Sequence, residues 1–178
     1  MVKLSAAVIN WNNRDHIIAC LDSLFSQQGV ALDVVMLDNG STDGSCEIVH
    51  ARFPNLRIIE NGRNLGFAAA HNIGYRETAG EWHLVLNSDV VIHSHYVARL
   101  LEACATDPVI GAASGKLLRM RTTDSENVID SVGMEMFESR RVWDRGTGEP
   151  DCGQYEQGQR IFGCCGAAAL YRRAALSE

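Results

Sequence analysis

Two polar motifs that directly follow apolar runs hold the residues of this sequence that could do chemistry. Residues 82–86 run into Asn87-Ser88-Asp89, and residues 34–37 run into Asp38-Asn39. Carboxylate and amide oxygens suit Mg²⁺ or Mn²⁺, cations that can bridge the two phosphates of a nucleoside diphosphate. Asp89 and Asn87 are therefore candidate metal ligands, although an Asn-x-Asp motif at a strand end is also typical of a simple turn.

The elements that must position these motifs alternate between strands and helices. Apolar runs predict strands at residues 4–9, 32–37, 56–59, 82–86 and 109–113, and helical spacing predicts helices at 17–25, 46–53, 68–75 and 96–104. This order predicts an α/β fold with a mainly parallel sheet and helices on both faces. Ligands of such sheets bind at the carboxyl ends of the strands, so both motifs should face one pocket. Thr42 or Asp43 should cap the helix at 46–53.

The pattern changes beyond residue 115, where the sequence becomes irregular and polar, with recurrent glycines. This part should be antiparallel or rich in loops. Residues 141–159 contain little apolar sequence, and they could form a lid over a ligand or a disordered surface loop.

Length and composition are those of one globular domain. The chain has 178 residues, of which 46% are hydrophobic and 21% are charged, which is enough for one core. A net charge of −6 and the lack of a long basic stretch argue against nucleic-acid binding. The six cysteines show neither zinc-type spacing nor the density of a secreted framework, so we expect reduced thiols. No signal peptide is evident, and no apolar run reaches the roughly 20 residues of a membrane span, so a cytoplasmic location is expected.

Several common phosphate-binding and catalytic motifs are missing. Asn10-Trp11-Asn12-Asn13 follows the first strand in place of Gly-x-Gly-x-x-Gly, which argues against a Rossmann dehydrogenase. Neither a Walker loop nor a Gly-x-Ser-x-Gly elbow is present. A bound phosphate would therefore have to be held by a metal or by side chains.

Four blocks of sequence occur in a specific order: Val8-Ile9-Asn10-Trp11-Asn12, residues 38–45, residues 61–74 and Leu86-Asn87-Ser88-Asp89. In this order they resemble the inverting family 2 glycosyltransferases of the GT-A fold, particularly the rhamnosyltransferase-like bacterial members. The resemblance covers nearly the whole chain. It implies one GT-A domain over residues 1–178, with a nucleotide-sugar-binding half at 1–115. Residues 116–178 would be the start of an acceptor-side half, incomplete because its C-terminal part is truncated.

The resemblance also implies a site. Residues 9–11, with Asp38 and Asn39, match the wall that holds the base and ribose of a nucleotide sugar. The turn at 64–66 and Asn72 match positions near the diphosphate and the sugar, where helix N-terminal amides favour anionic oxygen. Asn87-Ser88-Asp89 matches the Asp-x-Asp signature, with Asp89 as the direct ligand of Mg²⁺ or Mn²⁺ and a neutral Asn87 in place of the first acid. The residues expected to bind the nucleotide sugar are Ile9, Asn10, Trp11, Asp38, Asn39, Asn64, Gly66, Asn72, Asn87 and Ser88. Residues 163–173 match a strand that borders the donor sugar.

The implied reaction is transfer of a sugar, with rhamnose as the first candidate, from a dTDP- or UDP-linked donor. The acceptor would be a glycan or a lipid-linked glycan in cell-surface polysaccharide synthesis, and the full-length enzyme could associate peripherally with the inner face of the membrane. The general base of an inverting transfer is expected beyond Glu178, so no catalytic residue is assigned and the chain itself could be inactive. Two alternatives stay open: a non-catalytic nucleotide-sugar-binding module, and a sugar-nucleotide pyrophosphorylase, which would carry a Gly-rich basic loop after its first strand.

Overall fold

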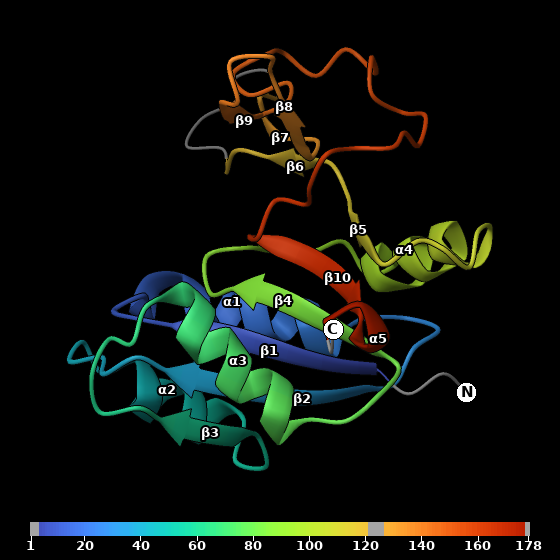
Figure 1. Ribbon diagram of the computed structural model, residues 1–178. Helices are drawn as coiled ribbons and strands as arrows, with labels where there is room; N and C mark the ends of the chain where they lie inside the picture. Colours follow the sequence, from blue (N-terminus) through green and yellow to red (C-terminus); the bar gives the residue numbers. More distant parts are fainter. Residues whose placement is uncertain (1–3, 121–126, 177–178) are drawn as a thin grey trace.

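A six-stranded sheet, ordered β3-β2-β1-β4-β10-β5, forms the centre of the computed structural model, which describes residues 4–120 and 127–176 (Figure 1). Its parallel strands are β1 (Leu4–Asn10), β2 (Leu32–Asp38), β3 (Arg57–Glu60) and β4 (Trp82–Asn87). β10 (Ala168–Arg172) pairs antiparallel with β4 on one side and with β5 (Ala112–Ser114) on the other. The predicted, mainly parallel sheet is confirmed.

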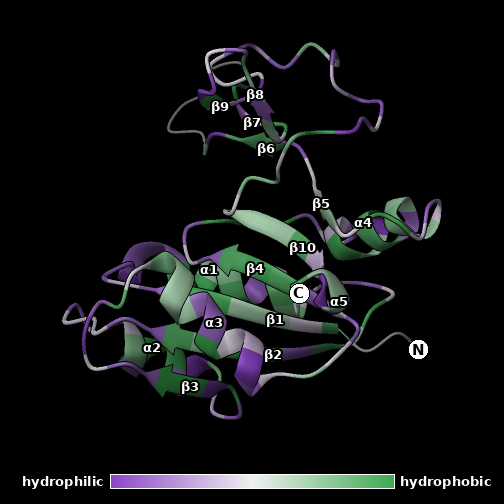
Figure 2. Ribbon diagram, in the orientation of Figure 1, coloured by the Kyte–Doolittle hydropathy of each residue, from purple (hydrophilic) through white to green (hydrophobic). Residues whose placement is uncertain are grey.

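Helices cover both faces of this sheet, because alternate side chains of a strand point to opposite sides. The helices are α1 (Arg14–Phe25), α2 (Ser45–Arg52), α3 (Phe67–Glu77), α4 (Tyr96–Ala105) and the short α5 (Arg173–Leu176). Helices α1, α2 and α4 share one core cluster with Ala6 and Val8 of β1, whereas α3 packs on Ala7 and Ile9. Figure 2 shows the apolar colouring of the central strands, and β1 is buried along its whole length.

The strand predicted at residues 109–113 begins later than expected. The Ile110 N–H donates to the Asp107 carbonyl over 3.1 Å, so the chain is still turning there, and Val109 is 85% exposed. The strand β5 therefore starts only at Ala112.

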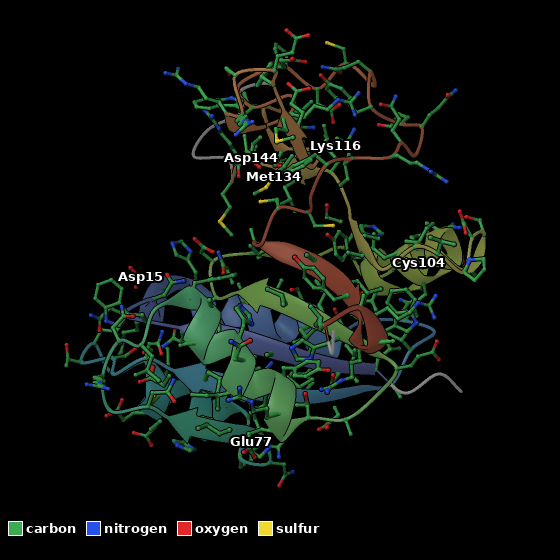
Figure 3. The ribbon with its side chains drawn as sticks, viewed as in Figure 1. Asp15, Glu77, Cys104, Lys116, Met134 and Asp144 are labelled. Atoms are coloured by element: carbon green, nitrogen blue, oxygen red, sulfur yellow. The ribbon has the colours of Figure 1, made fainter. Side chains whose placement is uncertain are left out.

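Residues 116–120 and 127–166 extend beyond the β10/β5 side of the sheet and form an antiparallel unit, here called the hairpin module (Figure 1). Within it, β6 (Leu117–Leu118) pairs with β7 (Ile129–Ser131), and β8 (Met134–Met136) pairs with β9 (Val142–Asp144). The Lys116 ammonium ties the module together, because it lies 2.9 Å from the Asp151 carboxylate and 2.6 Å from that of Glu156 (Figure 3). Antiparallel pairing is as predicted, and part of the stretch 141–159 is the strand β9.

Across the described part of the chain, no helix combines the length and the apolar character that spanning a bilayer requires.

Candidate functional site

A hollow of about 320 Å³ opens at the ends of β1 and β4, on the carboxyl edge of the parallel strands. Trp11 leaves 54% of its surface exposed there, and Asp89 is exposed as well. The residues that line the hollow are Ile9, Trp11, Asn12, Asn13, Asn87, Ser88 and Asp89. The structure therefore brings the predicted metal ligands together with Ile9 and Trp11 of the predicted wall. The motif at Asp38-Asn39 does not line this hollow, so the expectation that both motifs face one pocket is wrong for it.

The carboxylate of Asp38, at the end of β2, points into the protein. Asp38 is 2% exposed and accepts hydrogen bonds from the Gly40 N–H (3.1 Å), the Ser41 N–H (2.8 Å), the Ser41 hydroxyl (2.6 Å) and the Asn10 amide (2.9 Å). Burial alone would raise the pKa of Asp38, but the hydrogen bonds from Ser41 and Asn10 outweigh it and lower the pKa. The charge thus holds the loop that follows β2.

Asn10, the last residue of β1, and Asn12, which follows it, also hold the loop after β2 through hydrogen bonds. Asn10 is fully buried, and its Nδ2 atom lies 2.8 Å from the Ser45 hydroxyl. Asn12 adopts a positive φ of 49°, donates its N–H to Ser41 Oγ (2.9 Å) and accepts from the Thr42 N–H (2.8 Å). The loops after β1 and β2 are therefore joined by side chains from both.

The helix α2 begins differently from the prediction. Gly44 occupies its N-cap with a φ of 81°, so the expectation that Thr42 or Asp43 takes this position is wrong. Asp43 instead accepts from the Ser45 N–H (3.0 Å) and from the Arg14 N–H (2.8 Å). One carboxylate therefore satisfies amides at the first residues of α1 and α2, where negative charge is favourable.

Asn12 and Asn13 belong to the site but are not among the predicted residues. The Asn13 amide donates to the Ser88 hydroxyl over 2.9 Å, which connects the loop after β1 to the motif after β4. Ser88 is 6% exposed. The three asparagines among the four residues after Ile9 were the signal that could have identified them.

A second group of side chains lies together at the start of α3. Asn39 accepts through Oδ1 from the Asn61 amide (2.9 Å), and its Nδ2 atom is 3.4 Å from Asn64 Oδ1. Asn64 Oδ1 in turn accepts from the Gly66 N–H (2.8 Å). Gly66 is the N-cap of α3 with a φ of 81°, which glycine adopts without strain. Asn39, Asn64 and Gly66 are thus adjacent in the structure, and their predicted roles in binding the nucleotide sugar stay predictions.

Asn72 stands apart from the other predicted residues. It is exposed on α3, more than one helical turn after Gly66, and it does not line the hollow. Its predicted role near the donor sugar stays a prediction.

The oxygen atoms in the hollow suit a cation whose shell is completed by its ligand. Asp89 offers an exposed carboxylate and Asn87 a partly buried amide. Within residues 4–120 and 127–176, no group of three or more His, Cys, Asp or Glu side chains could hold a metal. Mg²⁺ is commonly bound by one or two carboxylates together with substrate phosphates and water. The donor set therefore fits a cation that is shared with a diphosphate.

Two buried histidines between α3 and the sheet were not predicted. Both ring nitrogens of His71 lack a hydrogen-bond partner in the described structure, and burial, with His83 nearby, lowers its pKa to about 3. His83 lies on β4 with Nδ1 2.9 Å from Ser5 Oγ, and burial, with the charge of Arg173, lowers its pKa to about 4. Both rings are therefore neutral at pH 7.

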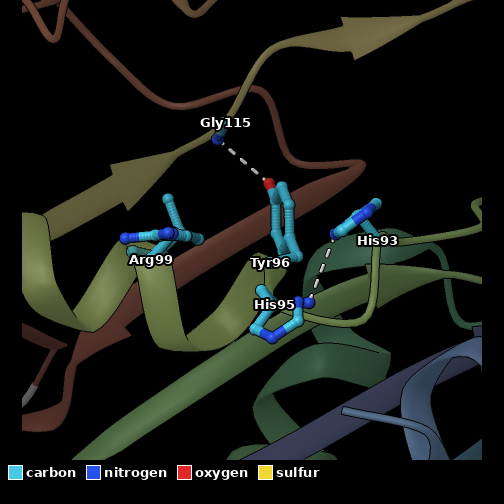
Figure 4. A pocket seen from close by; sticks show the side chains of 6 residues that line it. His93, His95, Tyr96, Arg99 and Gly115 are labelled. Atoms are coloured by element: carbon cyan, nitrogen blue, oxygen red, sulfur yellow. Dashed lines mark hydrogen bonds between the residues drawn. The ribbon is translucent and has the colours of Figure 1, made fainter. Parts of the chain in front are cut away.

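A second hollow of about 360 Å³ lies against α4 and is lined by His93, His95, Tyr96, Arg99, Leu100 and Gly115 (Figure 4). The Tyr96 hydroxyl accepts from the Gly115 N–H (3.0 Å) and donates to the Ala168 carbonyl (2.8 Å). The lining contains no carboxylate, so it lacks the oxygen ligands that suit a hard cation.

The six cysteines are all free, and Cys20 and Cys104 are buried as small apolar side chains. Burial, with Asp89 nearby, raises the pKa of Cys20 to about 12, so its thiol stays protonated.

Solved structures share this fold. A mannosyltransferase from Pyrobaculum calidifontis, solved with GDP-Man and Mn²⁺, matches with a TM-score of 0.65 and 22% identity, over 98% of this chain and 45% of that chain. At this identity the likeness shows the fold alone. The GT-A fold expected from the resemblance is confirmed.

Sequence relatives point the same way. An N-acetylglucosaminyl-diphospho-decaprenol L-rhamnosyltransferase from Mycobacterium tuberculosis is 32% identical over 127 residues, which are 65% of this chain and 41% of the relative. An N-acetylglucosaminyltransferase from Sinorhizobium fredii is 31% identical over 167 residues, which are 89% of this chain and 37% of the relative. The chain thus spans less than half the length of these relatives. The profile of glycosyl transferase family 2 matches residues 5–178, so the chain belongs to this family.

Proposed function

We propose that this chain binds a nucleoside-diphosphate sugar together with a divalent cation, as the donor-binding part of an inverting glycosyltransferase. One observation carries the proposal: the exposed Asp89, with Asn87 and Trp11, shares a single hollow at the carboxyl edge of β1 and β4. Residues 1–115 form the nucleotide-sugar-binding half, and residues 116–178 begin the acceptor-side half.

Exposed residues of the site would contact the ligand, and buried ones would hold the loops in place. Asp89 and Asn87 would hold Mg²⁺ or Mn²⁺, which supplies positive charge to the diphosphate as it leaves. The flat, exposed ring of Trp11 provides a surface for the base and ribose. Asp38 and Asn10 keep the loop after β2 in one conformation, and α3 begins after Gly66 with a helix N-terminus, where anionic oxygen is favoured.

The donor is a dTDP- or UDP-sugar, and dTDP-rhamnose is the first candidate. The support is the name of one relative, an L-rhamnosyltransferase, although another is named an N-acetylglucosaminyltransferase. The acceptor is a glycan or lipid-linked glycan of the cell surface. The complete enzyme would then act in the cytoplasm at the inner face of the membrane, with its general base beyond Glu178.

Thermal unfolding with UDP, dTDP and GDP, each with Mn²⁺ or with EDTA, tests the proposal. A ligand present at 100 times its Kd stabilises the native state by about 2.7 kcal/mol. We expect one nucleotide to raise the Tm only when Mn²⁺ is present.

Asp89→Asn should abolish this shift without changing the Tm of the free protein. Glu77→Gln is the matched control, because it removes an exposed carboxylate from the far end of α3 (Figure 3). A metal-dependent shift that survives in Asp89→Asn would contradict the assignment of Asp89 as the ligand. The absence of a shift for all three nucleotides would contradict donor binding by this chain.

A further inference from the structure

One face of the hairpin module carries an exposed tryptophan beside two charged groups. Trp143 on β9 is 64% exposed and lies directly opposite Glu135 on β8. Side chains of directly opposed residues stand on the same face, with Cβ atoms about 5 Å apart. Arg145 lies one residue beyond β9, but its backbone still pairs across the hairpin: its N–H donates to the Gly133 carbonyl over 2.9 Å, and its carbonyl accepts from the Val132 N–H over 3.0 Å. Two residues on from Trp143, its side chain is therefore on the same face. We call Trp143, Glu135, Arg145 and Tyr155 the Trp143 face.

Tyr155 belongs to this face through its contact with Arg145. The Arg145 guanidinium lies 4.7 Å from the centre of the Tyr155 ring, and the Tyr155 hydroxyl donates to the Glu149 carboxylate over 3.1 Å. This stacking holds the plane of the guanidinium against the Tyr155 ring.

The hydrogen-bonding groups of Glu135 and Arg145 are not used by the protein itself. In the described part of the chain, neither side chain takes part in an ion pair or a side-chain hydrogen bond. The face therefore offers a carboxylate that accepts and a guanidinium that donates, both within reach of an exposed ring.

This combination suits a sugar. The C–H face of a pyranose ring is apolar and gains dispersion contact on a flat indole, whereas its hydroxyl groups both donate and accept hydrogen bonds. Hydrogen bonds to ionised groups are about twice as strong as those between neutral groups. Because one negative and one positive group flank the ring, the charges favour a neutral ligand.

We propose that the Trp143 face binds a neutral pyranose unit of the acceptor glycan. The acceptor role depends on the proposed function, because only a transferase needs a second sugar. The module is attached beside the donor edge of the sheet: the Asn87 N–H donates to the Ala167 carbonyl over 2.9 Å, and residues 163–167 lead from the module to β10 at this point.

A lipid surface fits this face less well. An anionic membrane attracts basic clusters, whereas this chain has a net charge of −6 and the face holds Glu135 directly opposite Trp143. A carboxylate next to the inserting ring would also lose its hydration.

Ligand-observed NMR with neutral oligosaccharides tests the proposal on the whole chain. The probes are tetrasaccharides of β-linked glucose, β-linked N-acetylglucosamine, α-linked mannose and α-linked rhamnose. We expect saturable binding of at least one probe, weakened by about tenfold or more in Trp143→Ala and in Arg145→Met. Trp143→Phe should retain part of the affinity because a flat ring remains.

Met136→Ala is the matched control. Met136 is on the same hairpin and is 51% exposed, but it pairs with Val142, on the face opposite to Trp143. Figure 3 shows Met134 and Asp144 of that opposite face close together. Binding to no probe, or equal binding in Trp143→Ala, would refute the proposal, as would binding to phosphatidylglycerol vesicles without binding to any probe.

Nucleotide-induced thermal shifts measured on the same variants keep the two proposals separate. If oligosaccharide binding is absent while the Mn²⁺-dependent nucleotide shift is present, only the Trp143 face is refuted. If the oligosaccharide binds and no nucleotide does, the glycan site stands and the donor proposal is refuted.

Discussion

Acid should destabilise this fold through two buried histidines before its carboxylates begin to titrate. His71 and His83 are 7% and 1% exposed, and their pKa values are lowered from the ordinary 6.5 to about 3 and about 4, chiefly by burial. Between these values and 6.5, the unfolded chain binds more protons than the folded one. The free energy of unfolding therefore rises with pH in this range and falls as the pH drops below 6.5.

The size of the effect follows from the shifts. One pKa unit corresponds to about 1.4 kcal/mol, and at pH 5 an unfolded histidine is almost fully protonated while both folded rings are still neutral. Each ring therefore removes about 2 kcal/mol of stability between pH 7 and pH 5, or about 4 kcal/mol for the pair. This is a large part of the 5–15 kcal/mol that is typical of a whole domain.

Urea unfolding at pH 7, 6 and 5 measures this loss. His71→Leu removes one titrating group and should reduce the fall in unfolding free energy by about 2 kcal/mol, whatever its effect at pH 7. His50→Gln is the control, because His50 is exposed on α2 and its replacement should leave the pH dependence unchanged. A His71→Leu profile parallel to that of the wild type would refute the reasoning.

Three further substitutions test the packing and the loops. Asp38→Asn weakens four charge-assisted hydrogen bonds and should lower the urea unfolding free energy by about 1–3 kcal/mol; an unchanged midpoint would contradict this role. Gly74→Ala would place a Cβ 2.6 Å from a side chain of β1 and should cost about 1–3 kcal/mol, seen as a lower Tm than for an Ala introduced at exposed Gly158. Lys116→Met leaves the carboxylates of Asp151 and Glu156 without their cation, so amide exchange should accelerate in residues 151–156 but not in β1, and uniform acceleration would argue against a local role.

Apolar patterning was sufficient to predict the sheet and its helices. The strands β1, β2 and β4 are mostly apolar and each ends in a polar residue, so both their identity and their carboxyl ends can be predicted from the sequence. The place of β10 could not be predicted this way. It pairs between β4 and β5, although residues 88–167 separate it from β4, and no local pattern encodes such a partner.

The edge of the sheet that carries the candidate site could be predicted, but which of its two aspartates is buried could not. The motifs after β2 and β4 both contain an aspartate, and the rule for open α/β sheets places both at one edge. Which aspartate stays available depends on hydrogen bonds from other loops. Ser41 is three residues from Asp38 and could be anticipated, whereas Asn10 reaches it from another strand. His71 was missed because a histidine on an apolar helix face carries no signal of how deeply it will be buried.

Asp38 and Asp89 differ in exposure, and this difference distinguishes a structural carboxylate from one that can bind a ligand. Asp38 ends β2 and Asp89 lies two residues after the end of β4, but Asp38 is enclosed by four donors while Asp89 is exposed in the hollow. A carboxylate whose lone pairs are already occupied would have to break its loop to bind a cation, whereas an exposed one exchanges only water. Asp38→Asn should therefore reduce stability first and nucleotide binding as a consequence, and Asp89→Asn should reduce metal-dependent binding alone. Together the two variants distinguish residues that stabilise the loops of the site from residues that bind the metal and the nucleotide.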